Sequence, residues 1–151
     1  MAEIKRSVDT LIEADEGAYS IYDVQRIINK RAADAILIKV GKAGGLYNAK
    51  KIAAVAESAG LQCVIGTGWG LGIKVASKLH LATSTLVRPA VEFSEIYMHD
   101  MLLAKPYDNL GMLEGHGPPL QDGCLPVPDG PGFGVELDEN KVRKYITPDV
   151  P

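Results

Sequence analysis

The feature that most constrains the fold is an alternation of apolar, strand-like runs with helix-like segments, at a period of about 25 residues. Apolar runs at 11–14, 36–40 and 61–65 are each followed by a turn and then by apolar residues at helical spacing. A fourth, shorter run lies at 90–93. This order predicts a parallel sheet whose strands are joined by right-handed helical crossovers.

Turn and capping residues predict where the helices begin and end. Ser20 is expected to cap the first of these helices and Asn48 the second. Ala59 and Gly60 are expected to end the second helix. A third helix follows the glycine-rich loop 66–72.

The alternation stops after Ser94. Residues 105–134 contain many prolines and glycines, which favours a long ordered loop with short β pieces. Asp138 is expected to cap a last, short helix.

Composition excludes several function classes. The chain has 151 residues, enough for a real core, and a formal net charge of −3 gives no reason to expect nucleic acid or an anionic membrane as a partner. No apolar run approaches the roughly 20 residues that span a bilayer. The first residues show no apolar signal segment, and the two cysteines form no disulfide framework. We therefore expect a cytoplasmic protein.

The candidate functional residues are charged groups at the ends of the first two strands. Asp15 and Glu16 follow the first strand, and Lys39 follows the second. The carboxyl ends of parallel strands are where α/β barrels keep their chemistry, so Asp15 and Lys39 suggest a metal ligand beside a proton-transfer base. Burial among apolar residues is expected to lower the pKa of Lys39. The alternative is a salt bridge from Lys39 to Asp15 or Glu16, and Lys42 is expected to be a loop residue that faces solvent.

Five short motifs resemble the enolase superfamily, specifically the C-terminal half of the barrel domain in its mandelate racemase and muconate-lactonizing (muconate cycloisomerase) subgroup. Asp15 and Lys39 stand 24 residues apart, which fits that family's spacing. The motifs are Ala14-Asp15-Glu16, Ile38-Lys39, Lys42-Ala43-Gly44-Gly45, Gly66-Thr67 and Pro131-Gly132-Phe133-Gly134-Val135.

The resemblance implies a fold. It implies the α/β class and a (β/α)8 TIM-type barrel of parallel strands, of which this chain would be the C-terminal half. Residues 1–104 would form a partial barrel of about four β-α units, the family's units five to eight. Residues 105–151 would be a Pro/Gly-rich C-terminal extension that packs on the barrel and ends in a short helix.

The resemblance also implies a function. The enzyme would be a Mg²⁺-dependent racemase, epimerase, cycloisomerase or dehydratase that abstracts a proton next to the carboxylate of a small substrate. By residue-for-residue correspondence, Lys39 would be the acid/base, Asp15 a Mg²⁺ ligand, and Glu16 a neighbour that orients the site.

Three further residues are expected to line the substrate pocket: Thr67, Trp69 and Glu95. Relatives that lactonize muconate tend to carry a glutamate a few residues after Gly-Thr, where this chain has Trp69 and Gly70. That departure argues against simple muconate cycloisomerisation and not against the superfamily.

Two other readings stay open. The family's Lys-x-Lys motif and two further metal carboxylates are missing, and Mg²⁺ usually takes more than one carboxylate. The chain would then be a catalytically silent half-barrel that self-associates through its open strand edges, or a piece that pairs with the missing N-terminal half. In the third reading, the loop 66–72 binds phosphate.

Overall fold

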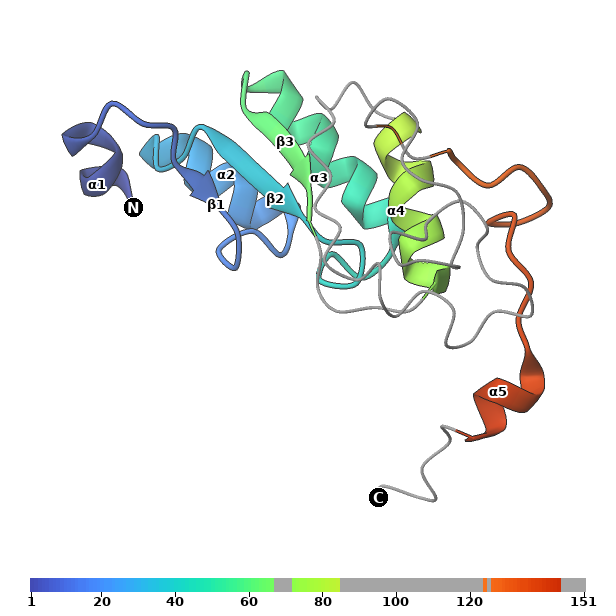
Figure 1. Cartoon of the computed structure of the whole chain (residues 1–151). Coiled ribbons are helices and arrows are strands. Elements are labelled where there is room, and N and C mark those ends of the chain that lie inside the picture. The colour runs from blue at the N-terminus through green and yellow to red at the C-terminus, as the bar shows by residue number, and fades with distance from the viewer. Residues whose placement is uncertain (67–71, 85–123, 125, 145–151) are drawn as a thin grey trace. The chain divides into compact units, whose positions relative to one another are not determined.

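The computed structural model describes residues 1–66, 72–84, 124 and 126–144 (Figure 1). The chain divides into two compact units, Met1–Gly68 with Leu81–Phe93 and Trp69–His80 with Ser94–Pro151. Several sequence predictions lie outside the described residues: the strand at 90–93, the pocket residues Thr67, Trp69 and Glu95, and the boundary between 104 and 105.

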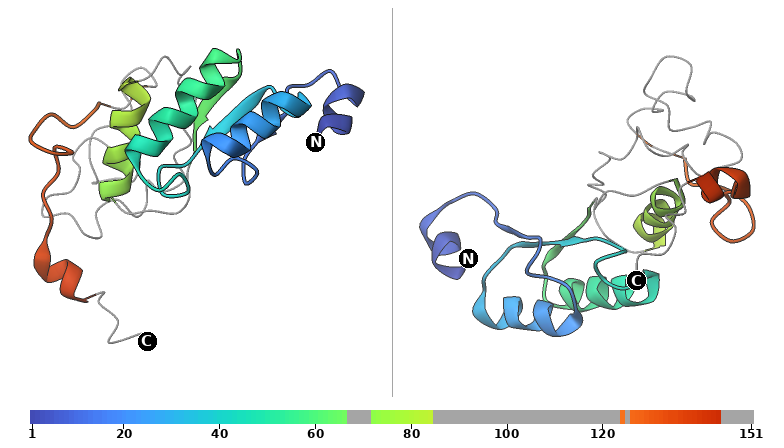
Figure 2. Two further views of the ribbon diagram at one scale, coloured as in Figure 1. Left: turned by 180° about the vertical axis from the view of Figure 1, so that it is seen from behind. Right: turned by 90° about the horizontal axis from the view of Figure 1, so that it is seen from below.

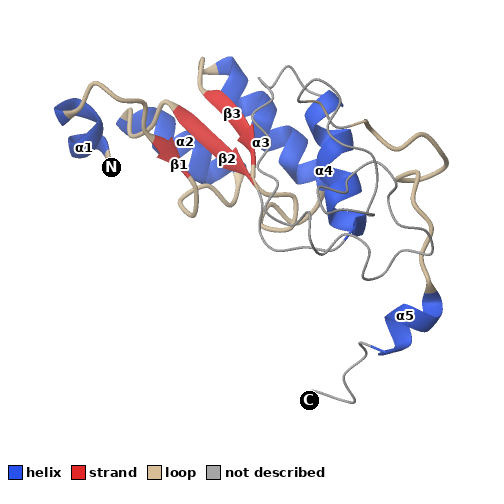
Figure 3. Ribbon diagram, in the orientation of Figure 1, coloured by secondary structure: helices blue, strands red, loops and turns tan. Residues whose placement is uncertain are grey.

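The first unit contains a three-stranded sheet with helices between its strands (Figure 3). All described strand pairs are parallel, and the strands lie side by side in chain order, as the β-α alternation predicts. Its elements are α1 (Ala2–Ser7), β1 (Glu13–Ala14), α2 (Ile21–Lys30), β2 (Ala35–Ile38), α3 (Leu46–Ser58) and β3 (Gln62–Ile65).

The helices α2 and α3 cover the same face of this sheet (Figure 2). Val24 and Ile27 of α2 and Ile52 of α3 are buried in one apolar cluster with Ile36 and Ile38 of β2. All four residues of β2 are buried, which explains why this strand reads as a continuous apolar run in the sequence.

The predicted cap at Ser20 is confirmed, and the predicted cap at Asn48 is wrong. The Ser20 Oγ accepts a hydrogen bond from the backbone N–H of Asp23 at 3.3 Å. The following helix, α3, begins earlier than expected, because Gly45 is its N-cap with φ of 112°. A residue without Cβ can hold this conformation, so the loop turns into the helix before it reaches Asn48. The helix ends at Ala59, as predicted.

The second unit holds most of α4 (Gly72–Ser84) and all of α5 (Glu139–Lys144). The His80 imidazole Nε2 lies 3.2 Å from the carbonyl oxygen of Phe133, and the two rings are 5.9 Å apart. The backbone N–H of Asn140 donates to Asp138 Oδ1 at 2.9 Å, which agrees with the predicted cap at Asp138.

No helix within residues 1–66, 72–84 and 126–144 combines the length and the apolar character needed to cross a lipid bilayer.

Candidate functional site

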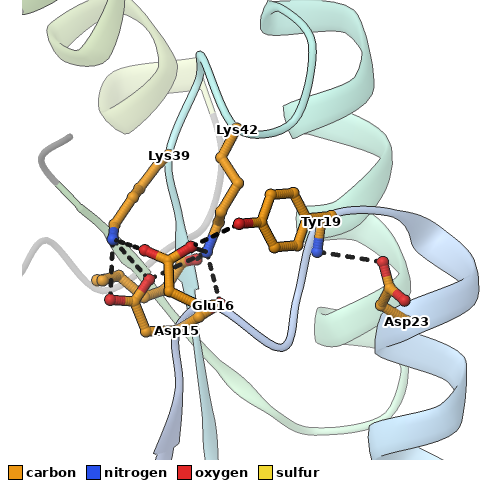
Figure 4. A network of polar contacts seen from close by, with 7 residues as sticks. Asp15, Glu16, Tyr19, Asp23, Lys39 and Lys42 are labelled. Carbon is orange, nitrogen blue, oxygen red and sulfur yellow. Dashed lines mark hydrogen bonds and ion pairs between the residues drawn. The ribbon is translucent and has the colours of Figure 1, made fainter.

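Asp15, Glu16 and Lys39 meet at the carboxyl end of the parallel sheet (Figure 4). Asp15 and Glu16 directly follow β1, and Lys39 directly follows β2. Because adjacent parallel strands end at the same edge, residues 24 positions apart come within hydrogen-bonding distance. The Lys39 Nζ lies 2.7 Å from Asp15 Oδ1 and 2.8 Å from Asp15 Oδ2.

The Lys39 ammonium also donates to Glu16 Oε1 at 2.6 Å. Its side chain is 13% exposed, whereas the side chains of Asp15 and Glu16 are 41% and 60% exposed. A shielded cation is therefore held by two carboxylates that remain open to solvent. This is the salt bridge that the sequence left as an alternative for Lys39.

Lys42 belongs to the same cluster, and the prediction that it faces solvent is wrong. Its side chain is only 6% exposed. The Lys42 ammonium donates to the Asp15 carbonyl at 2.5 Å, to Asp15 Oδ1 at 3.0 Å and to the Leu37 carbonyl at 3.3 Å. Three acceptors match the three protons of the ammonium, which offsets the cost of burying it.

The loop after β2 explains how Lys42 reaches this position. The backbone N–H of Ala43 donates to the Lys39 carbonyl at 2.9 Å, so the chain makes a helix-like turn there. Residues three apart on such a turn lie on the same side. The spacing of Lys39 and Lys42 was therefore a signal that places both ammonium groups at the sheet edge.

Tyr19 is a second residue of the cluster that the sequence did not suggest. Its hydroxyl donates to Glu16 Oε2 at 3.1 Å, and its ring centroid lies 5.5 Å from the Lys42 Nζ. The available signal was its place directly before the helix cap Ser20, where the chain enters α2 a few residues after the end of β1. From that point the Tyr19 side chain reaches the cluster from the side of α2 (Figure 4).

The charges of the cluster are mutually stabilised. Hydrogen bonds to Asp15 and then to Glu16 raise the pKa of Lys39 above its ordinary value, although burial acts in the opposite sense. The predicted lowering of the Lys39 pKa is therefore wrong, because the two carboxylates outweigh desolvation. Lys39 is a cation at neutral pH in this arrangement.

The carboxylates respond in the opposite direction. Burial raises the pKa of Asp15, but hydrogen bonds from Lys39 and Lys42 outweigh it and hold that pKa below its ordinary value. Hydrogen bonds from Lys39 and then Tyr19 lower the pKa of Glu16. The bond to Glu16 raises the pKa of the Tyr19 hydroxyl. Both carboxylates are therefore anions at neutral pH.

The described residues do not by themselves fit a complete Mg²⁺ site. Mg²⁺ requires near-octahedral oxygen coordination. Within residues 1–66, 72–84, 124 and 126–144, no three side chains of His, Cys, Asp or Glu gather where they could hold a metal ion. The oxygens of Asp15 already accept from two ammonium groups. Asp15 could therefore supply one ligand to Mg²⁺, but the described residues do not complete the coordination shell.

A surface hollow of about 270 Å³ lies beside the cluster, on the side of α2 and α3. Tyr19 borders it, but Asp15, Glu16 and Lys39 do not. The hollow is therefore not a substrate pocket around the Lys39 ammonium. The predicted pocket residues Thr67, Trp69 and Glu95 lie outside the described part of the chain and stay predictions.

The family model and the most similar relatives point to the same family. Residues 1–141 match the enolase C-terminal domain-like family. The chain is 31% identical over 150 residues to muconate cycloisomerase 1-1 of Acinetobacter lwoffii, covering 96% of the chain and 36% of that enzyme. It is 31% identical over 130 residues to L-Ala-D/L-Glu epimerase of Clostridium acetobutylicum, covering 86% and 34%.

A solved structure agrees with these sequence matches. A protein from Roseovarius nubinhibens described as a mandelate racemase/muconate lactonizing enzyme, complexed with magnesium, superposes with a TM-score of 0.75 at 26% identity. The match covers 93% of this chain and 35% of that protein. The chain thus spans about a third of the length of these relatives.

These matches confirm the predicted fold class, a parallel α/β fold that corresponds to part of the barrel of these enzymes. The chain therefore belongs to the enolase C-terminal domain-like family, and its relatives include muconate cycloisomerases and other members of the enolase superfamily.

Proposed function

We propose that this chain is the C-terminal part of an enolase-superfamily isomerase or lyase and that Lys39 transfers a proton next to a carboxylate of a small substrate. The observation that carries this proposal is the ammonium of Lys39 at the carboxyl end of the sheet, 2.6 Å from Glu16 and 2.7 Å from Asp15. A shielded amine aligned by fixed carboxylates suits general acid and base chemistry.

The arrangement described here is the proton-donating state of the site. With both carboxylates ionised, Lys39 keeps its proton and can deliver it to a carbon that carries negative charge. To act as the base, the Lys39 amine must first lose its proton, which requires weaker contact with Asp15 and Glu16. The two halves of a racemisation or epimerisation would use these two states in turn.

Mg²⁺ is part of the proposal for the complete enzyme. One structural relative contains magnesium, and Asp15 is a solvent-accessible carboxylate at the carboxyl end of the sheet. We propose Asp15 as one ligand, with the remaining oxygens coming from barrel strands outside this chain. Glu16 then keeps its contact with Lys39 and orients the site.

The test replaces Lys39 with Ala in the polypeptide as its gene encodes it. L-Ala-L-Glu and muconate are the first probes, because relatives are named for them. In deuterated water, the wild type is expected to exchange the α-hydrogen of the glutamate in L-Ala-L-Glu, or to place deuterium next to a carboxylate of the lactone that it forms from muconate. Losing a general acid/base slows such reactions by about 10² to 10⁴-fold, and Lys39→Ala is expected to fall in that range.

The control is Lys50→Ala, which removes an exposed lysine of α3 and leaves the cluster intact. It is expected to exchange at the wild-type rate. Exchange by Lys39→Ala at the same rate as Lys50→Ala would refute the role of Lys39.

A second candidate is a catalytically silent half-barrel that self-associates. Two observations favour it: the lack of a metal-binding cluster in the described residues and the pairing of Asp15 with two lysines. Calorimetry with Mg²⁺ and sedimentation of the native polypeptide separate the candidates. Absent Mg²⁺ binding in a dimer of this chain would favour the silent form, and stoichiometric binding would favour the enzyme.

A further inference from the structure

Tyr19 connects the N-terminus of α2 to the charged cluster. Its backbone N–H donates to Asp23 Oδ2 at 3.2 Å, and the hydroxyl of Ser20 donates to the same oxygen at 2.7 Å. Asp23 is in the first turn of α2 and is also paired with Arg26. The backbone of Tyr19 is therefore tied to a helix of the core rather than to a free loop.

The two carboxylate oxygens of Glu16 accept hydrogen bonds from different partners, and Tyr19 is one of them. Its hydroxyl donates to Oε2, while Lys39 donates to Oε1 (Figure 4). A glutamate that is 60% exposed would otherwise rotate among several rotamers. A carboxylate held at both oxygens has a defined plane, and so has a defined direction toward the Lys39 ammonium.

The ring of Tyr19 supplies a second restraint. It lies 5.5 Å from the Lys42 ammonium, a distance at which a cation is attracted to an aromatic face. The Lys42 ammonium in turn donates to Asp15. Tyr19 thus contacts Glu16 directly and contacts Asp15 indirectly, through Lys42. In the described contacts it touches neither Asp15 nor Lys39.

We propose that Tyr19 is a positioning residue, which acts through Glu16 to fix the direction of the Lys39 ammonium. The inference rests on the proposed proton transfer by Lys39. A lysine reaches its target through a flexible stem, and a misplacement of about 1 Å can cost 10²-fold in rate, so the reaction gains from a fixed ammonium. The substrate does not need to touch Tyr19.

The first test measures the geometry in this chain without any assay of activity. Lysines are labelled with limiting acetic anhydride, and the acetylation rate of Lys39 is compared with that of the exposed Lys30 by mass spectrometry. Tyr19→Phe removes the hydroxyl and keeps the ring. A net hydrogen bond corresponds to a factor of about two to ten, so Lys39 is expected to become two- to tenfold more reactive.

Tyr22→Phe is the matched control. Tyr22 stands on the same helix and is 73% exposed, and no hydrogen bond from its hydroxyl occurs in the described residues. Lys39 is expected to react in this variant as in the wild type. Equal Lys39 reactivity in Tyr19→Phe and Tyr22→Phe would overturn the inference.

The double variant shows whether Tyr19 acts through Glu16. Glu16→Ala removes the carboxylate that Tyr19 holds, so adding Tyr19→Phe to it is expected to change nothing further. Independent, multiplying effects of the two substitutions on Lys39 reactivity would mean that Tyr19 works by another route, and would also overturn the inference.

The second test measures kinetics in the polypeptide as its gene encodes it, with L-Ala-L-Glu as the probe. Tyr19→Phe is expected to lower kcat for proton exchange by about two- to tenfold with KM unchanged, because only the direction of Lys39 changes. A changed KM with unchanged kcat would contradict this. If the wild type exchanges no proton, the proposed function fails, while the labelling result still decides the geometry.

Discussion

Two aspartate–lysine clusters lie at opposite ends of the same sheet and are built in different ways. At the amino end, Asp34 precedes β2 and pairs with Lys5 of α1. Asp34 Oδ2 also accepts the backbone N–H of Ile12 at 3.0 Å, and Lys5 donates to the Ala33 carbonyl at 3.1 Å. This pair ties backbone segments together.

At the carboxyl end, the contacts described for the carboxylates come from side chains. Asp15 and Glu16 accept from Lys39 and Lys42, and Tyr19 adds its hydroxyl. Such a cluster can exchange partners without breaking a backbone hydrogen bond of the sheet. The difference fits the general division of α/β barrels, in which the amino end serves stability and the carboxyl end serves chemistry.

After Lys39→Ala, the largest expected effect comes from replacing each of the two aspartates with asparagine in turn. The two variants test whether the carboxyl end serves chemistry and the amino end serves stability. Asp15→Asn loses the charge that aligns Lys39, so the rate of proton exchange is expected to fall by about 10²-fold. Asp34→Asn is expected to leave that rate unchanged and to lower the midpoint temperature of unfolding. Exchange kinetics and thermal unfolding are measured on both variants, and equal rates in the two would contradict the comparison.

Replacing the two lysines that hold these aspartates is expected to lower the free energy of unfolding by different amounts. Lys42→Met removes the ammonium that donates to the Leu37 carbonyl and to Asp15, and the Asp15 carbonyl keeps only the N–H of Ala18. This is expected to cost about 1–3 kcal/mol in the free energy of unfolding. Lys5 is 28% exposed, and Lys5→Met is expected to cost less than about 1 kcal/mol. Urea denaturation measures both. A larger loss in Lys5→Met would reverse this ranking.

The dependence of stability on pH gives a smaller expected difference between the two ends of the sheet. Lowered pKa values of Asp15 and Asp34 stabilise the fold above their ordinary value of 3.8, and this stability is lost as the pH falls further. The raised pKa of Lys39 acts at the other extreme. Its contribution is full below 10.5 and is lost as the pH rises above that value.

The loss of folding stability at alkaline pH is therefore expected to come from the cluster at the carboxyl end of the sheet. It is measured by urea denaturation between pH 9 and 12 with Lys39→Met as the comparison. Both proteins carry Cys63→Ala, because burial raises the pKa of that thiol to about 11 and adds its own alkaline loss. Lys39→Met is expected to flatten the curve. An unchanged slope would mean that the pair with Asp15 and Glu16 adds no stability.

Sequence reasoning succeeded where local signals decide the structure. The β-α period, the cap at Ser20 and the end of α3 at Ala59 follow from short-range patterns, and the structure has them. It failed at Asn48, because Gly45 at positive φ starts the helix earlier. A residue with good capping chemistry is displaced when a neighbour without Cβ offers a tighter turn.

The candidate site was predicted in part. The positions of Asp15, Glu16 and Lys39 at strand ends follow from the chain order, because parallel neighbours end at one edge. Lys42 and Tyr19 depend on how the loop after β2 and the turn before α2 fold back. Their side-chain directions arise from long-range contacts that a linear pattern does not contain.

The sequence by itself determined the parallel β-α order, the family and the edge at which the charged residues gather. Only the tertiary structure decided the charge state of Lys39, the burial of Lys42 and the contact of Tyr19 with Glu16. The physical reason is that periodicity and capping are properties of neighbours along the chain. A pKa or a hydrogen-bond partner depends on the distances among groups up to 27 residues apart, and these exist only after β1 and β2 have paired.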